Sequence, residues 1–127
     1  MSENRVFDLE DRLIDFSVLA IEVTNSLPGT QAGQHFSGQL IRSGSSSALN
    51  YGEAQAAESR KDFIHKSKII LKELRESMVC LKIIQKANLC PDISMVDQAT
   101  AECNELISIF VKSIQTAQRN LDSKKHF

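Results

Sequence analysis

The side chains that could carry out metal or acid–base chemistry are few and widely spaced. The run Asp62-Phe63-Ile64-His65 resembles the Glu-x-x-His pair of di-iron helical bundles, but such a site needs a second pair and two further carboxylates. No second pair is present. His35 lies near the start of an expected helix and His126 lies in the C-terminal tail. We therefore expect no metal site and no cofactor.

Nucleophilic chemistry is not indicated either. Three cysteines (Cys80, Cys90 and Cys103) form no CxxC pair and no Cys/His set, so we expect reduced, mostly structural thiols. The small-residue run from Ser43 to Ala48 lacks the glycine spacing of a phosphate-binding loop. We interpret these small side chains as a surface that lets a neighbouring helix come close. No catalytic residue is identified, and we expect a protein that is not an enzyme.

Length and composition favour a small folded domain. The chain has 127 residues, 42% of them apolar and 24% charged, which suits one domain with a single core. Ser2-Glu3-Asn4-Arg5 lacks the apolar centre of a signal peptide, and no apolar run approaches the ~18 residues of a membrane span. We expect a cytoplasmic protein with no membrane partner and identify no small-molecule substrate.

Four segments place apolar residues at alternating spacings of three and four, which is typical of helices with one buried side. They cover about residues 4–26, 31–57, 59–89 and 92–122. Breaks are predicted at Pro28-Gly29, at the capping sequence that begins with Ser59, and at Pro91. The sequence predicts an all-α, antiparallel up-down-up-down four-helix bundle in one domain, residues 1–127, with a fraying tail from Ser123.

The periodicity also predicts which apolar side chains are inside. In the first segment a heptad pattern is flanked on one side by further apolar residues, so we expect an apolar surface wider than a coiled-coil seam. The heptad residues are Val6, Leu9, Leu13, Phe16, Ala20, Val23 and Leu27, and the flanking residues are Phe7, Ile14 and Ile21.

Charges of opposite sign are segregated on two of the predicted helices. Residues 1–26 hold six acidic and two basic residues, whereas residues 59–89 hold eight basic and three acidic ones. We define the acidic face as Asp8, Asp11, Asp15 and Glu22, interrupted at Val18. We define the basic face as Lys61, His65, Lys68, Lys72, Arg75, Lys82 and Lys86, interrupted at Val79.

Three interpretations of these charged faces stay open. They can simply keep the protein in solution. The acidic face of one subunit can contact the basic face of the next, in a heterologous contact that closes into a ring. The basic face can instead bind the phosphates of RNA or DNA, although no aromatic platform or base-reading motif accompanies it.

A string in the second and third segments resembles a known family. It comprises Gln39-Leu40-Ile41-Arg42-Ser43-Gly44, then Asn50-Tyr51-Gly52-Glu53-Ala54, then Glu58-Ser59-Arg60-Lys61-Asp62-Phe63. It is similar to the four helix bundle proteins first noticed inside intervening sequences of bacterial large-subunit ribosomal RNA genes. Many relatives read N-I-A-E-G at the second element, from which Tyr51 and Gly52 depart.

The resemblance implies a homopentameric ring of four-helix bundles with no established enzymatic activity. The family is also similar to the accessory variability protein of diversity-generating retroelements, a basic pentamer that binds nucleic acid, whereas this chain has a formal net charge of −1. Among the motif residues, Arg42, Asn50 and Glu53 are the polar side chains expected to be partly buried. We interpret them as structural, in an Arg42–Glu53 or Asn50–backbone network within or between subunits.

The expected function is therefore a non-enzymatic, oligomeric scaffold or binding module. The alternative is an accessory protein that binds nucleic acid through its basic face.

Overall fold

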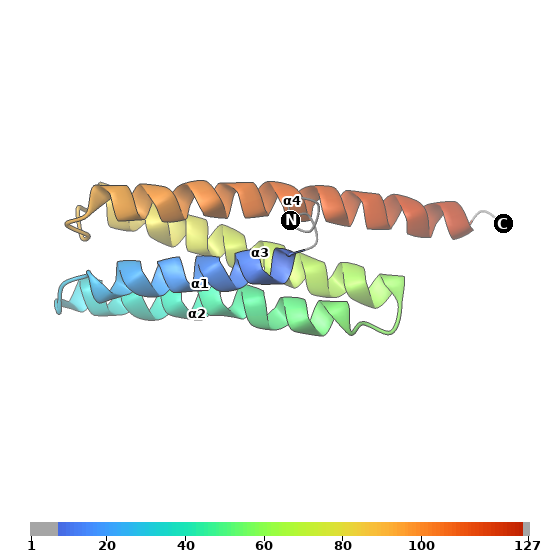
Figure 1. The fold of residues 1–127 in the computed structure, drawn as a ribbon, viewed down its shortest axis with the longest axis horizontal. Helices are drawn as coiled ribbons and strands as arrows, with labels where there is room; N and C mark the ends of the chain where they lie inside the picture. The colour runs from blue at the N-terminus through green and yellow to red at the C-terminus, as the bar shows by residue number, and fades with distance from the viewer. Residues whose placement is uncertain (1–7, 126–127) are drawn as a thin grey trace.

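The computed structural model describes residues 8–125, which form four helices joined by short connections. They are α1 (Leu9–Asn25), α2 (Gln31–Gln55), α3 (Arg60–Lys86) and α4 (Ile93–Lys125) (Figure 1). Helices α1 and α3 each pack against both α2 and α4, and within these residues the backbones of α1 and α3 lie diagonally across the bundle. The fold is the antiparallel four-helix arrangement that the sequence predicts.

Side-chain caps and one left-handed residue explain where the helices begin and end. The Thr30 hydroxyl accepts a hydrogen bond from the Gly33 amide at 3.1 Å, and the Ser59 hydroxyl accepts one from the Asp62 amide at 3.0 Å. The second bond confirms the predicted cap. At the end of α3, Asn88 has a φ of 55°, and the Leu89 amide donates to the Ile84 carbonyl at 3.0 Å. This six-residue closure is typical of a helix C-terminus.

The C-terminal ends of α3 and α4 each differ from the predicted bounds by three residues. Helix α3 stops at Lys86 and not at residue 89, because the left-handed Asn88 turns the chain. Helix α4 runs to Lys125 and not to residue 122, and its last turns extend beyond the α2–α3 connection (Figure 1). The predicted helical residues 4–7, with Val6 and Phe7, lie outside the described residues, as do His126 and Phe127.

The core takes residues from all four helices, and it includes Leu13, Phe16, Ala20 and Val23 of the predicted heptad, whereas Leu9 and Leu27 are half-buried. Its largest fully buried side chains come from all four helices: Leu13, Phe16, Val23, Leu40, Ile70, Leu74, Leu81, Ile84, Val96, Cys103, Leu106 and Phe110. The prediction for the flanking residues of the first helix is wrong, because Ile14 is 46% and Ile21 is 42% exposed. They lie about 100° around α1 from Leu13 and Ala20, at the outer edge of the helix, where α2 does not cover them.

The small-residue run of α2 serves close packing, as predicted. A Cβ atom added to Gly44 would lie 3.1 Å from the Cβ of Ala20 in α1. The Ser17 hydroxyl of α1 donates to the Gly44 carbonyl at 3.0 Å, and the hydroxyls of Ser43 and Ser77 are 2.7 Å apart inside the bundle. Small side chains on this face let α2 approach both neighbours while every hydroxyl named here has a partner.

Candidate functional site

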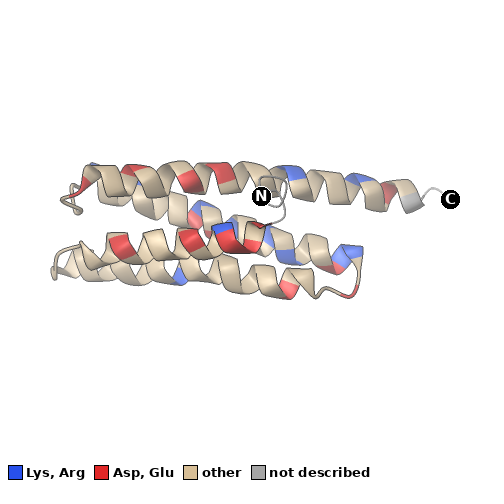
Figure 2. Ribbon diagram, viewed as in Figure 1, with Lys and Arg blue, Asp and Glu red and all other residues tan. Residues whose placement is uncertain are grey.

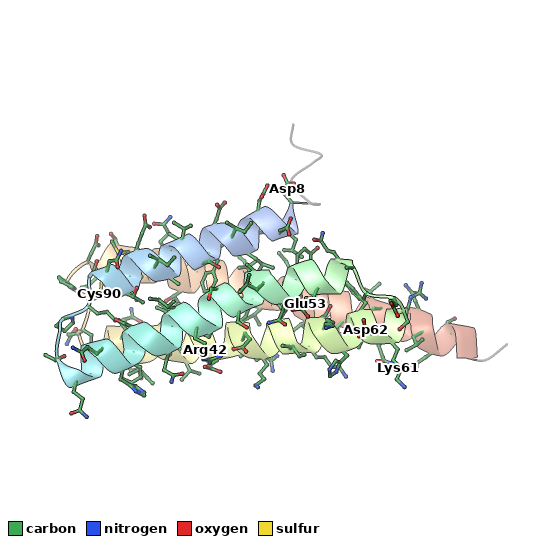
Figure 3. All side chains as sticks on the ribbon, turned by 90° about the horizontal axis from the view of Figure 1, so that it is seen from below. Asp8, Arg42, Glu53, Lys61, Asp62 and Cys90 are labelled. Atoms are coloured by element: carbon green, nitrogen blue, oxygen red, sulfur yellow. The ribbon has the colours of Figure 1, made fainter. Side chains whose placement is uncertain are left out.

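The basic face lies on the outside of α3. All seven of its residues are exposed, and so is the interrupting Val79, at 57%. The spacing of three and four residues keeps them on one side of the helix, opposite the buried Ile70, Leu74 and Leu81. Lys61 points outward near the start of α3 (Figure 3). His65 lies on this outer surface and is therefore not directed toward the bundle centre, where a di-iron site would be.

The acidic face lies on the outside of α1 and continues onto α4. Asp8, Asp11, Asp15 and Glu22 are all exposed. A groove of about 480 Å³ between the two helices is lined by Asp8, Asp11, Asp15, Arg12 and Glu105. The sequence analysis missed the glutamate of α4 because it treated each helix separately.

Arg12 is the cation within this acidic groove. Its guanidinium lies 2.8 Å from Glu102 and 3.0 Å from Glu105, both on α4. The hydrogen bond with Glu102 raises the pKa of Arg12 above its ordinary value. Arg12 therefore links α1 to α4. It forms no ion pair with the carboxylates of the acidic face.

The ion pairs within the chain are formed by residues that belong to neither the acidic face nor the basic face. Across residues 8–123 they join Arg12 to Glu102 and Glu105, Arg42 to Glu73 and Glu76, and Lys66 to Glu53. The fold does not bring the acidic and basic faces together either, since they lie on α1 and α3, which sit diagonally across the bundle. Figure 2 shows acidic residues along α1 and basic ones along α3.

The motif residue Arg42 is structural in a different way from the one predicted. Its guanidinium bonds to the half-buried Glu76 and, at 3.2 Å, to Glu73, which is buried in α3. Arg42 is exposed, so the expectation that it is partly buried is wrong. The expected pair with Glu53 does not form within the chain, because eleven residues along one helix separate the two side chains by about 16 Å. Figure 3 shows Arg42 and Glu53 well apart along α2, both on the side that faces α3.

Of the other two motif residues, Asn50 lies as predicted and Glu53 does not. Glu53 is exposed and pairs with Lys66 at 2.9 Å, so the expectation that it is partly buried is wrong. Asn50 is half-buried, and its amide donates to the Ser46 carbonyl at 2.8 Å, which confirms the predicted bond to the backbone.

The cysteines have the surroundings of structural residues. All three are buried, and the thiol of Cys103 donates to the Leu74 carbonyl at 3.2 Å. Burial raises the pKa of Cys103 to about 12 and also raises the pKa of Cys80. A thiol with such a pKa is protonated at neutral pH and is a poor nucleophile.

The described residues present neither a cluster of metal ligands nor a helix suited to a membrane span. Between residues 8 and 123, no three His, Cys, Asp or Glu side chains lie close enough together to hold a metal ion. In that same part of the chain, no helix has the length and apolar character required to cross a bilayer.

Two grooves at the C-terminal end of α4 were not expected from the sequence. The larger, about 850 Å³, lies between α4 and the α2–α3 connection and includes Arg60, Phe63 and Lys112 in its walls. The second, about 580 Å³, is lined by Lys68 of the basic face together with Arg119 and Asp122 of α4. Basic residues of α4 thus lie beside those of α3, a neighbourhood that follows from the packing of the two helices.

Comparison with known proteins places this chain in a family. A solved structure from Bacteroides thetaiotaomicron, described as a protein with unknown function from the S23 ribosomal protein family, is similar to this chain with a TM-score of 0.76 and 27% sequence identity. The similarity covers 84% of this chain and 97% of that one. No curated protein matches the chain significantly. The family model described as 23S rRNA-intervening sequence protein matches residues 7–112, and the chain therefore belongs to the 23S rRNA-intervening sequence protein family.

Proposed function

We propose that this chain is a non-enzymatic subunit of a homo-oligomer that acts as a scaffold or binding module. Neighbouring copies contact each other through the acidic face of one and the basic face of the next. The observation that carries this proposal is the state of the two faces: both are exposed, and neither takes part in an ion pair across residues 8–123.

Segregated charge supports a partner for these faces. Like charges three or four residues apart on a helix cost a few tenths of a kcal/mol per pair. Elsewhere in the same chain, Arg12, Arg42 and Lys66 each have acidic partners on a neighbouring helix. A surface that needed only solubility would be equally well served by mixed charges.

The two faces also match in register. Counting from Val18 on α1 and from Val79 on α3, Asp11 corresponds to Lys72, seven residues before each valine. Asp15 and Glu22 match Arg75 and Lys82 to within one residue, or about 1.5 Å along the helix. This match holds for helices that run in the same direction.

Parallel pairing suits a ring. Helices α1 and α3 run the same way in one bundle and sit diagonally across it, so copies related by rotation about an axis along the helices can repeat the contact. A head-to-tail contact of this kind closes when the rotations complete a circle. The family resemblance implies a pentamer, and we adopt that number in the proposal.

The test is the mass of the oligomer in solution. Sedimentation velocity should give several subunits for the unaltered protein and a lower mass for the double variant Asp11→Lys, Asp15→Lys. Adding Lys72→Glu and Arg75→Glu to that variant should restore the assembly, because the charges are again complementary. Reversing Glu58 and Asp122, which lie on neither face, serves as the control. A monomeric unaltered protein would contradict the proposal.

A second candidate function is binding of RNA or DNA through the basic face. It is favoured by Arg119 and Lys112 of α4, which line grooves together with Lys68 and Arg60 of α3, although Asp122 also lines the groove of Lys68 and Arg119. Phosphate contacts release counterions, so affinity should fall steeply with salt.

Fluorescence anisotropy with duplex DNA and with a structured RNA, over a range of salt concentrations, tests this candidate. Replacing Lys68, Lys72 and Arg75 with Gln should weaken binding and reduce the log–log salt slope by about two to three. Lys66→Gln is the control, since Lys66 lies off the face and pairs with Glu53. No binding at low salt would exclude the candidate.

A further inference from the structure

Exposed apolar side chains gather on the outside of α1 and α2. We call this surface the α1–α2 face and define it by the five large residues on it and their exposed fractions: Ile14 (46%), Val18 (48%), Ile21 (42%), Ile41 (42%) and Leu49 (71%). Single exposed apolar residues are ordinary on a protein surface, but a contiguous group usually marks an interaction site.

Two hydrogen bonds between the helices show that the group is contiguous. The Ser17 hydroxyl donates to the Gly44 carbonyl at 3.0 Å, and the Ser37 hydroxyl donates to the Thr24 carbonyl at 3.5 Å. Because the helices are antiparallel, these two contacts define which residues of α1 and α2 lie at the same height along the bundle. Ile21 lies at the height of residues 40 and 41. Ile21 and Ile41 are therefore neighbours across the α1–α2 seam.

The α2 part of this face carries no charge. The Lys, Arg, Asp and Glu residues of α2 are Arg42 and Glu53, and both form ion pairs with α3. Figure 2 shows α2 almost uniformly uncharged, and Figure 3 shows both labelled side chains on the side facing α3. The Ser45 hydroxyl donates to its own helix, at the Ile41 carbonyl, at 2.7 Å. A partner can thus cover Ser45 without leaving its donor unpaired.

The outer positions of α2 are symmetric about Ser45. Moving away from it in either direction, a large aliphatic residue comes after four positions and a glycine after seven: Gly38, Ile41, Ser45, Leu49 and Gly52. A Cβ atom added to either glycine would meet nothing within 4 Å. If a second α2 crosses antiparallel at Ser45, Ile41 meets Leu49 of the other copy and the glycines allow close approach.

The exposed apolar residues of α1 are centred at nearly the same level along the bundle as Ser45 of α2. In α1, Ile14 and Ile21 are centred close to Val18. By the heights defined above, Ser45 lies opposite residue 16 of α1, about two residues or 3 Å from that centre. One two-fold axis can therefore place Ile14 against Ile21 of the second copy while α2 packs on α2.

We propose that the α1–α2 face binds the same face of a second copy of this chain, antiparallel, across a two-fold axis close to Ser45. No other described surface presents as many exposed aliphatic residues, so the best complement of this face is itself. The 25 residues of α2 span ~37 Å and the 17 residues of α1 span ~25 Å, and each helix is ~10 Å wide, which gives an area on the order of 600 Å². That is about three-quarters of the ~800 Å² each partner contributes to a standard interface.

This contact goes beyond the proposed head-to-tail assembly and uses none of its charged residues, although Val18 borders both surfaces. The acidic residues Asp11, Asp15 and Glu22 lie at the rim of the α1–α2 face, where they stay in solvent. The basic face on α3 takes no part.

Engineered cysteines test the geometry directly. Under mild oxidation Ser45→Cys should form a disulfide-linked dimer, because the two side chains meet at the axis. Ile41→Cys and Leu49→Cys should each link poorly to themselves, since identical positions are ~12 Å apart, whereas an equal mixture should form heterodimers. The unaltered protein is the background control, because its three cysteines are buried.

A charge in the face tests its contribution to association. Leu49→Glu should raise the dissociation constant of the two-fold contact at least about tenfold, because a carboxylate would be buried without a partner. Ile93→Glu is the matched control: Ile93 is 62% exposed but lies at the start of α4, away from the face. Circular dichroism should show that both variants remain helical.

The outcomes separate the two proposals. Association that persists in Leu49→Glu, together with no cross-link through Ser45→Cys, would overturn the two-fold contact and leave the head-to-tail scaffold standing. Cross-linking that persists after reversal of Asp11 and Asp15 would support the two-fold contact on its own. A protein monomeric at all concentrations would overturn both.

Discussion

The inner and outer faces of α2 are both rich in small residues, yet they have different surroundings. On the inner face, a Cβ atom at Gly44 would lie 3.1 Å from Ala20, and Ser43 bonds to Ser77. On the outer face, Gly38 and Gly52 have nothing within 4 Å of an added Cβ. Small side chains are thus packed against other helices on the inner face of α2 and exposed on its outer face. Small residues permit close helix packing, but they do not say whether the partner belongs to the same chain.

The first prediction uses the largest contrast between the two faces. Leu40→Ala on the inner face should lower the free energy of unfolding by ~2–5 kcal/mol, because Leu40 is fully buried and its loss leaves a cavity. Leu49→Ala on the outer face should change it by less than ~0.5 kcal/mol in the single chain. Urea unfolding at low protein concentration measures both, and equal losses would show that the outer face is covered as tightly as the inner one.

The second prediction concerns serine hydroxyls on the two faces. Ser43→Ala should cost ~1–3 kcal/mol, because it leaves the buried Ser77 hydroxyl without its partner. Adding Ser77→Ala should cost less than a second such loss, since both polar groups are then gone. Ser45→Ala is the outer-face control and should be nearly neutral. Additive single and double variants would mean that the Ser43–Ser77 bond contributes little.

The third prediction is a difference in sign. Gly38→Ala and Gly52→Ala should each stabilise the single chain by up to ~1 kcal/mol, since alanine is the better helix former and the space is open. Gly44→Ala should instead destabilise it by ~1 kcal/mol, because the Ala20 Cβ is fixed to its backbone and the helices must separate. Thermal unfolding of the three variants provides the measurement, and stabilisation by Gly44→Ala would show that the seam has room to spare.

The smallest expected effect probes the buried interior through pH. In the unfolded chain Cys103 loses its proton near the ordinary pKa of 9.0, whereas in the folded chain it keeps it to about 12. The unfolded state therefore binds fewer protons above pH 9, and stability should fall as pH rises from 8 toward 12. Between pH 8 and 9.5 the loss should stay below about 1 kcal/mol.

The control for this pH dependence is Cys103→Ala, which removes the titrating thiol from both states. Its unfolding free energy should decline less over the same interval than that of the unaltered protein. An identical decline in the two proteins would show that Cys103 does not contribute to the pH dependence.

Local patterns in the sequence determined the helices and most of the core. Ser59 caps α3 where the sequence predicted it, and Phe16, Leu74 and Phe110 are buried as their spacing required. These features depend on residues within a few positions of one another, because helix formation and amphipathicity repeat every 3.6 residues. The positions of the charged faces on the outside of α1 and α3 follow from the same period.

Only the tertiary structure decided which side chains meet across helices. Periodicity places Ile14 and Ile21 beside the core, yet α2 packs so that both stay exposed. Arg42 pairs with Glu73 and not with Glu53, because partners on α3 are nearer than residues three turns away on α2. Such pairings depend on the relative rotation and level of packed helices, which no single helix encodes. The open α1–α2 face is a consequence of the same packing.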